Sequence, residues 1–375
     1  MRDLETMSKF EFNNVVKLYN QLSIDILSDI VSKIEKNGLS FDKETEFQLR
    51  KIFQLNGEEV FYQTLNKINK IEPKIKKELT KLFKTAVNNE LNEYENLYKY
   101  RNKTLKISLS QEQIYKSGIK NTINELKLTN KKIAYESENL YNNLIKKAYI
   151  ETITGAFTYQ EAVQRAYEQV KKDGLTITSE NGRKYQVDNV IRLNVFSQIR
   201  DTTNEINQDI EKELGCDGKE VTAHIGARPS HAEFQGKQFA LNKEGAEKFN
   251  VTLWSEVESL WQEYYCRHTH FGIILGLETP VYNKAELKEI ENAKVVYKNK
   301  TIPYYEATQL QRRKELEIRS LKRVSELNKN LEKDNTNTKF KLKEKISNYN
   351  NFCKELGLTV YKGRLTIWEK QKQTW

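Results

Sequence analysis

The chain has 375 residues, of which 38% are hydrophobic and 30% are charged, and its formal net charge is +10. A chain of this length normally forms two or three domains, and its apolar content excludes a wholly disordered protein. No apolar run approaches the roughly 18 residues that span a bilayer, so we expect no membrane partner. The first ten residues contain no apolar stretch, so we expect no secretory signal. The number of cysteines is odd, so we expect reduced thiols rather than a disulfide framework.

Residues 1–150 carry apolar side chains at helical spacing, which predicts four to six helices, some of them elongated. Asn56-Gly57 has the composition of a helix stop, and Pro73 suits the first turn of the next helix. Ser110 precedes a glutamine by three residues, the spacing of a capping box that would open a further helix. We therefore predict an elongated helical N-terminal region.

Residues 151–280 mix helical and strand signals, which predicts a compact α+β core. Thr158 and Glu161 have capping-box spacing and should open a helix over 159–173. A hairpin is expected to turn at Asn181-Gly182. The further elements expected here are a helix capped by Asp188 and ended by Gly215, a strand over 220–225, a short helix capped by Ser230 with Glu233, a helix over 249–262 and a strand over 264–275.

Residues 281–375 form the basic part of the chain: they contain 22 Lys and Arg against 12 Asp and Glu, whereas residues 1–280 contain 40 of each. A hairpin is expected over 295–302, followed by a charged helix over 304–332. A second helix ends at Gly357, and the two should pair as a helical hairpin or coiled-coil arm. The segment 358–367 predicts a terminal β-hairpin. The whole chain is thus expected to be α+β and predominantly helical.

All four histidines lie between positions 224 and 270. If 264–275 is a strand, alternation places Cys266, His268 and His270 on one face. Together with His224 and His231, these side chains could close a tetrahedral zinc site. The spacing is not that of a known zinc finger. The alternative is a set of buried, hydrogen-bonded histidines that hold the upstream loop against the strand.

Three stretches carry a family resemblance: VTAHIGARPSHAEFQGKQF (221–239), YYCRHTHFG (264–272) and YYEATQLQRRKELEIRSLKR (304–323). Together they resemble the phage minor capsid protein 2 family, which is related in motif layout to the Mu F-like head morphogenesis proteins. The resemblance covers about 140–370. Phe234 and Tyr265 depart from a common form of the family, which has Trp and Asn there. The motif residues are His224, Arg228, Pro229, His231, Gly236, Cys266, Arg267 and His268.

The resemblance implies a structural virion protein of a tailed phage or prophage, present in few copies inside or at the base of the head near the portal vertex. It implies a part in head assembly, with the portal protein and other capsid proteins as partners and packaged DNA as a further candidate. The protein would reach the virion from the host cytoplasm, where assembly takes place. No settled enzymatic activity accompanies the family.

For the motif side chains themselves, structural roles are favoured. Arg228 precedes a proline, so its backbone should be extended, and its side chain should tie the loop to an acid such as Glu233 rather than clamp a phosphate. His231 is expected to anchor the loop, and Cys266 to be a buried thiol rather than a nucleophile. Trp254 and Trp261, seven residues apart, should pack into a core.

Two other functions remain open beside the capsid role. A metal-dependent hydrolase could be built on the His/Cys segment, if an open coordination position and a general base are present. A DNA-binding protein could use the basic C-terminal hairpin, because cations along one helix can follow a phosphate backbone. The side chains proposed for that contact are Arg312, Arg313, Arg319, Lys322 and Arg323.

Overall fold

The computed structural model describes residues 13–37, 46–261, 266 and 268–367. Within these ranges the protein is predominantly helical with three small antiparallel sheets, which confirms the predicted α+β class. No helix in the described ranges is long and apolar enough to cross a membrane.

In chain order the elements are α2 (Asn14–Asn37), α3 (Glu46–Glu93), α4 (Glu95–Tyr100), α5 (Leu109–Ile153), α6 (Tyr159–Asp173), β1 (Thr176–Thr178), β2 (Lys184–Gln186), α7 (Val187–Leu214), β3 (Gly218–Val221), α8 (Pro229–Ala232), β4 (Gln238–Ala240), α9 (Lys243–Phe249), α10 (Trp254–Trp261), β5 (His270–Ile273), α11 (Lys284–Glu291), β6 (Lys294–Tyr297), β7 (Lys300–Pro303), α12 (Tyr304–Asn330), α13 (Thr336–Glu355) and the 3-10 helix η2 (Lys362–Leu365).

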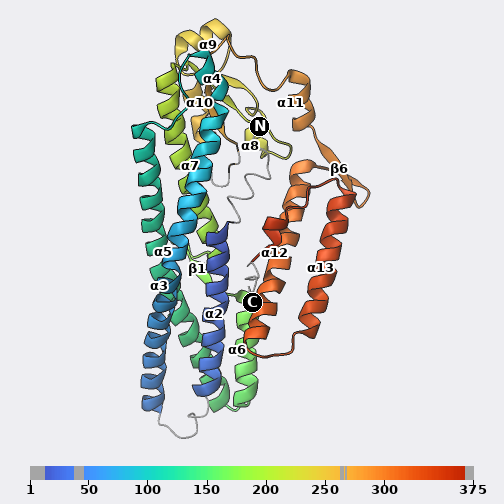
Figure 1. The fold of residues 1–375 in the computed structure, drawn as a ribbon. Helices are drawn as coiled ribbons and strands as arrows, with labels where there is room; N and C mark the ends of the chain where they lie inside the picture. Colours follow the sequence, from blue (N-terminus) through green and yellow to red (C-terminus); the bar gives the residue numbers. More distant parts are fainter. Residues whose placement is uncertain (1–12, 38–45, 262–265, 267, 368–375) are drawn as a thin grey trace, which may run out of the picture.

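Two very long helices set the length of the molecule (Figure 1). Helix α3 has 48 residues and α5 has 45, which corresponds to about 72 and 68 Å at the rise of an α-helix. They pack along each other, and α5 also packs along α7, while α2 lies against all three. The elongated helical N-terminal region is present as predicted.

The predicted break and restart within α3 are wrong, because the helix continues through Asn56, Gly57 and Pro73. Pro73 lies on the exposed face, where the carbonyl that loses its amide partner can be hydrated. Gly57 faces α5, where a Cβ would come within 2.6 Å of Asn142 Oδ1. Packing against neighbouring helices therefore maintains α3 at positions that local propensity disfavours.

Helix capping follows the sequence rules at one predicted site and shifts at another. Thr158 and Glu161 form the predicted box at the start of α6. The box of α5 is formed by Ser108 and Gln111 rather than by Ser110. Ser110 instead donates to Asp209 of α7, 3.1 Å away. The predicted turn at 181–182 is confirmed by the antiparallel β1–β2 pair.

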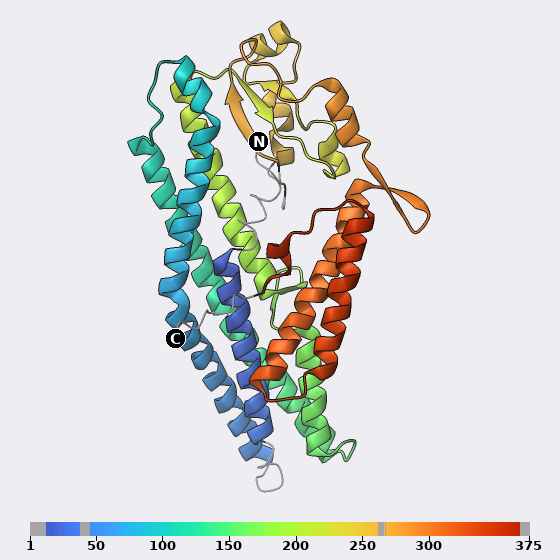
Figure 2. The ribbon, with the colours of Figure 1, turned by 45° about the vertical axis from the view of Figure 1, so that its right-hand side comes forward.

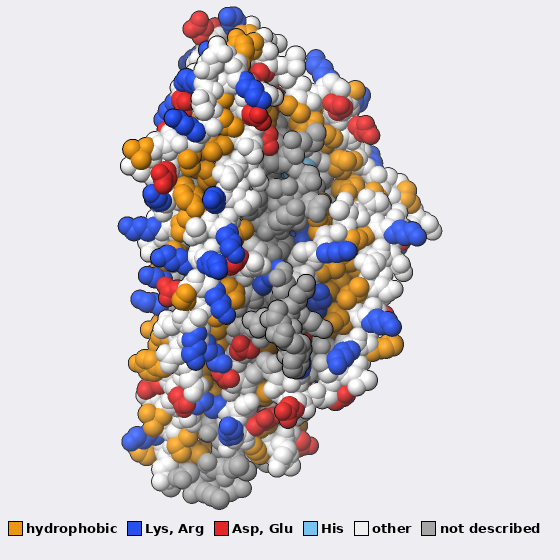
Figure 3. Space-filling view, in the orientation of Figure 1, with side chains coloured by type: hydrophobic (Ala, Val, Ile, Leu, Met, Phe, Trp, Pro, Cys, Tyr) orange, Lys and Arg blue, Asp and Glu red, His pale blue; other side chains and the backbone are white. Residues whose placement is uncertain are grey.

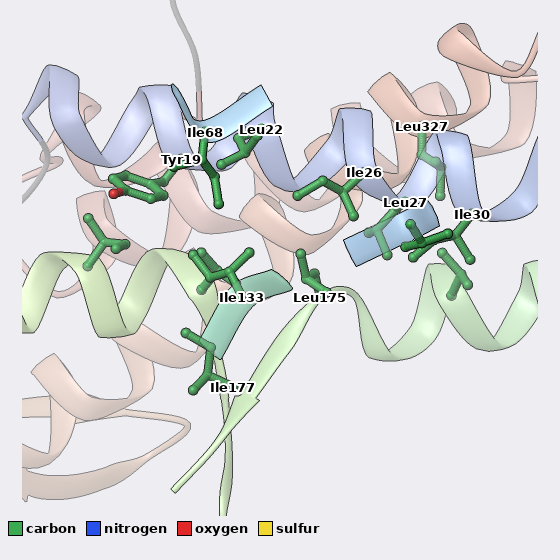
Figure 4. Close-up of a cluster of buried hydrophobic side chains, with 14 of the residues drawn as sticks. Tyr19, Leu22, Ile26, Leu27, Ile30, Ile68, Ile133, Leu175, Ile177 and Leu327 are labelled. Atoms are coloured by element: carbon green, nitrogen blue, oxygen red, sulfur yellow. The ribbon is translucent and has the colours of Figure 1, made fainter. Parts of the chain in front are cut away.

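The main apolar core lies inside the bundle and includes residues from both ends of the chain (Figure 4). Leu22, Ile26 and Ile30 of α2 are buried there together with Ile133 of α5. Leu327 of α12 belongs to the same core. The basic C-terminal helix therefore contributes to the bundle core, and it packs along α2 rather than projecting as a separate coiled-coil arm.

Helix α7 connects the bundle core to a second apolar cluster. Val195 and Ile199 lie in the bundle core, whereas Ile206, Ile210 and Leu214 belong to a cluster with apolar residues at the end of α3 and with tyrosines in and just before α4. The helix ends at the left-handed Gly215, as predicted. Its expected cap at Asp188 is wrong, because Gln186 occupies the N-cap position and contributes no side-chain hydrogen bond.

A three-stranded antiparallel sheet of order β4-β3-β5 lies at one end of the long helices (Figure 2). It is attached to the bundle through β5: Gly272 N donates to Tyr94 Oη at 2.9 Å, and Asn207 Nδ2 donates to the carbonyl of His270 at 3.3 Å. Strand β3 begins and ends earlier than the expected 220–225. Strand β5 is shorter than the expected 264–275, of which residues 264, 265 and 267 lie outside the described residues.

The β6–β7 hairpin and the α12–α13 helical hairpin are present as predicted. The terminal β-hairpin over 358–367 is wrong, since this segment carries η2. Backbone carbonyl groups of this segment accept hydrogen bonds from side chains of α12. Gln311 Nε2 donates to Thr359 O at 2.8 Å, and Arg319 Nη1 donates to Arg364 O at 3.2 Å. The division of the chain at residues 150 and 280 stays a prediction.

The close approach of α5 to α7 can be tested at Gly118. A Cβ there would lie 2.1 Å from Thr202 Oγ1 and 3.0 Å from a ring carbon of Phe83. Gly118→Ala should lower the free energy of unfolding by about 1–3 kcal/mol, although alanine favours helix formation. Denaturant unfolding measures the change, and Ser117→Ala at the adjacent exposed position is the control. A Gly118→Ala protein as stable as the parent would contradict the packing described.

Candidate functional site: a buried His/Cys triad beside an arginine-rich cavity

The loop after β3 carries the first half of the site. Arg228 has the extended backbone expected before a proline, and Pro229 begins the single-turn helix α8. The predicted capping box with Ser230 is wrong, because Arg228 is the N-cap residue and makes no side-chain cap. Gly236 ends the loop with φ +67°, and a Cβ there would lie 2.3 Å from Leu287, so this position requires glycine.

Three side chains of the motif meet at one buried point. Cys266 Sγ lies 3.5 Å from Nδ1 of His231 and 3.5 Å from Nδ1 of His268, and the two nitrogens are 3.4 Å apart. All three residues are buried. We call His231, Cys266 and His268 the triad. It joins α8 to the segment before β5, which is the docking of loop and Cys-Arg-His segment expected from the sequence.

The tautomer of His268 follows from its hydrogen bonds. Gln235 Oε1 accepts the backbone N–H of His224 at 3.0 Å, so this atom is an acceptor. The same oxygen lies 3.1 Å from Nε2 of His268, which must therefore carry the proton. In the neutral ring, Nδ1 then presents its lone pair to the other two members of the triad.

The triad lies in apolar surroundings. The ring of Trp261 meets the rings of His231 and His268 edge-on, with centroids 5.5 and 5.2 Å apart. Trp254 and Trp261 pack into the same cluster as Cys266, which confirms their predicted core role. Burial, reinforced by the charges of His224, His231 and Arg228, lowers the pKa of His268 to about 2. His268 is therefore a neutral imidazole at physiological pH.

Two of the five predicted metal ligands do not join the triad. His270 lies within β5 and meets Trp254 edge-on at 4.8 Å. The alternation argument fails because Cys266 and His268 precede the strand instead of lying in it. His224 stacks on His268 with centroids 4.5 Å apart and planes 25° apart. Arg267 lies outside the described residues.

A cavity of about 160 Å³ opens beside the triad and extends to α12. Five arginines line it, so its potential is positive. Glu315 also lines it, accepting a hydrogen bond from Tyr349 Oη at 3.1 Å and lying 3.9 Å from Arg364 Nη1. A glutamate held in this way is a poor match for the general base that a metal-dependent hydrolase needs. The arginines are Arg192, Arg228, Arg312, Arg319 and Arg364.

Most of the basic side chains that were expected to contact DNA instead form ion pairs or hydrogen bonds within the protein. Arg319 and Arg323 lie 3.7 and 3.6 Å from the buried carboxylate of Asp188, and Lys322 donates to the carbonyl of Leu365. Burial lowers the pKa of Arg319, and the Asp188 carboxylate opposes that shift. Only Arg312 and Arg313 of the predicted set are exposed. On the face in Figure 3, Lys and Arg side chains are scattered among acidic ones over both the bundle and the hairpin.

Sequence reasoning missed two residues of this region. Gln235 fixes the tautomer of His268, and its one available signal was a polar residue one turn after His231. Asp188 was interpreted as a helix cap, but its carboxylate is the buried partner of two arginines. Neither role follows from spacing, because both partners are distant in the chain.

The fold and the site together define a predominantly helical protein in which His231, Cys266 and His268 of the motif meet in a buried cluster. The chain matches the family described as phage minor capsid protein 2 over residues 7–354, and it belongs to that family. This confirms the resemblance and extends it toward the N-terminus. No curated protein and no solved structure matches the chain. Membership supports a structural role in a phage particle, together with other capsid proteins.

The buried Asp188–Arg319 contact gives a stability prediction. Arg319→Gln should lower the free energy of unfolding by about 3 kcal/mol, because it leaves a buried carboxylate with fewer partners. Arg313→Gln, the same substitution at an exposed position of α12, should change it little. Thermal or denaturant unfolding of the two variants makes the comparison. Equal stabilities would show that Arg319 is not part of a buried ion pair.

Proposed function

We propose that this protein is a low-copy component of the head of a tailed phage or prophage, placed at the portal vertex and acting in head assembly. The observation that carries the proposal is the family match over residues 7–354. The portal protein and other capsid proteins are the proposed partners. The protein would be made in the host cytoplasm and remain in the assembled virion.

The structure is consistent with an assembly part rather than a reaction centre. Helices α3 and α5 form a stiff body about 70 Å long, which can bridge neighbouring subunits. His231, Cys266 and His268 of the motif hold the loop that carries α8 against the segment before β5. We leave packaged DNA out of the proposal, because Arg319, Lys322 and Arg323 are engaged within the protein.

Quantitative mass spectrometry of purified particles tests the proposed role. The protein should be present in far fewer copies than the major shell protein, and co-expression should yield a complex with the portal protein. Its absence from purified particles would contradict a virion role.

The location needs a separate measurement. Chemical cross-linking of intact particles through the exposed lysines of α3 and α5 should connect this protein to the portal protein. Cross-links confined to shell subunits distant from the portal would refute the portal-proximal position while leaving the virion role intact. Comparison of full particles with emptied heads then shows whether the protein leaves with the genome.

A further inference from the structure

The triad has the dimensions of a metal-binding site. In tetrahedral zinc sites the Zn–N distance is about 2.0–2.1 Å and the Zn–S distance about 2.3 Å, so ligand nitrogens lie about 3.4 Å apart and nitrogen and sulfur about 3.5–3.6 Å apart. The triad shows 3.4 Å between its nitrogens and 3.5 Å for each nitrogen–sulfur pair. We propose that His231, Cys266 and His268 bind one Zn²⁺ ion per chain.

Hydrogen bonding alone accounts less well for this triangle. Hydrogen bonds from N–H donors are most often about 2.9–3.0 Å long, and the two Nδ1 atoms are farther apart than that. If only an N–H···N hydrogen bond held the rings of His231 and His268 together, we would expect their Nδ1 atoms to approach each other to about 2.9–3.0 Å. The observed spacing leaves room for an ion in contact with all three atoms.

The lone pair of His268 is already directed at the ion position. Gln235 Oε1 accepts from Nε2 and keeps the proton there, which leaves Nδ1 to coordinate. Metal-binding histidines commonly donate their second N–H to such a partner, which fixes the ring and its tautomer. Gln235 is thus a positioning residue of the proposed site.

The donor set selects the kind of metal. One thiolate and two neutral imidazoles suit Zn²⁺, whereas Mg²⁺ and Ca²⁺ prefer oxygen ligands. The triad lies on the wall of the arginine-rich cavity, so the fourth coordination position faces that space and can be filled by water or an anion. His224 is not assigned as a ligand, because its ring stacks on His268 and it is not among the side chains whose ligand atoms lie within 4.8 Å of one another.

The ion would act as a cross-link within the protein. His231 and Cys266 are 35 residues apart in sequence, and both are buried. Zinc would fasten α8 to the segment that leads into β5, in a protein whose thiols are expected to stay reduced. This inference does not depend on the position of the protein in the particle.

Metal analysis of the full-length protein tests the site. Protein supplied with zinc and then dialysed should retain one zinc ion per chain. Cys266→Ser should lose it, and Cys216→Ser, which alters a cysteine outside the triad, should retain it. Gln235→Leu should weaken zinc binding by about 10–100-fold. His224→Ala should keep the full stoichiometry.

A second readout works even if a variant fails to fold. Cobalt(II) added to the metal-free parent should give the strong visible bands of a tetrahedral site and a thiolate-to-cobalt charge-transfer band in the near ultraviolet. Zinc should also raise the melting temperature of the parent, because it binds the folded state. A parent protein without stoichiometric zinc, a Cys266→Ser protein that retains it, or a cobalt spectrum without the thiolate band would each overturn the proposal.

Discussion

The burial of helix α7 along its length determines where the other elements lie. Its buried residues, most of them apolar, recur at helical spacing from Val187 to Leu214, and they face the bundle at one end and the sheet at the other. Each end also carries a buried acid with a basic partner from elsewhere: Asp188 meets Arg319 of α12, and Glu211 lies 3.0 Å from Lys219 of β3. A buried carboxylate is costly without such a partner, so α7 fixes both the C-terminal hairpin and the sheet.

Local signals predicted much of the fold, and they failed where distant contacts decide. The box at Thr158, the turn at 181–182 and the stop at Gly215 each depend on residues within one turn, and all were found. The sequence SLSQEQ contains two serines that each precede a glutamine by three residues. Asp209 of α7 contacts both serines, and no rule of spacing could choose between them. Contacts between distant segments also explain Pro73: packing of α3 against neighbouring helices keeps this residue within the helix, although local propensity disfavours it.

The site was predictable as a set of residue types but not as a geometry. Clustering of His and Cys in sequence pointed to His231, Cys266 and His268, and the structure unites them. His270 was grouped with them by strand alternation, which cannot apply before the strand begins. The cavity arginines come from α7, α12, η2 and the loop after β3, so only the tertiary fold brings them together.

The pairing of Asp188 with α12 also bears on how the protein is made. The two partners are 131 positions apart, so α7 leaves the ribosome well before Arg319 is synthesised. Leu327, which completes the bundle core, is made later still. A nascent or truncated chain that lacks α12 therefore keeps an uncompensated carboxylate and an open apolar surface on α2. We therefore expect a chain that stops before α12 to aggregate or be degraded more readily than one that includes this helix.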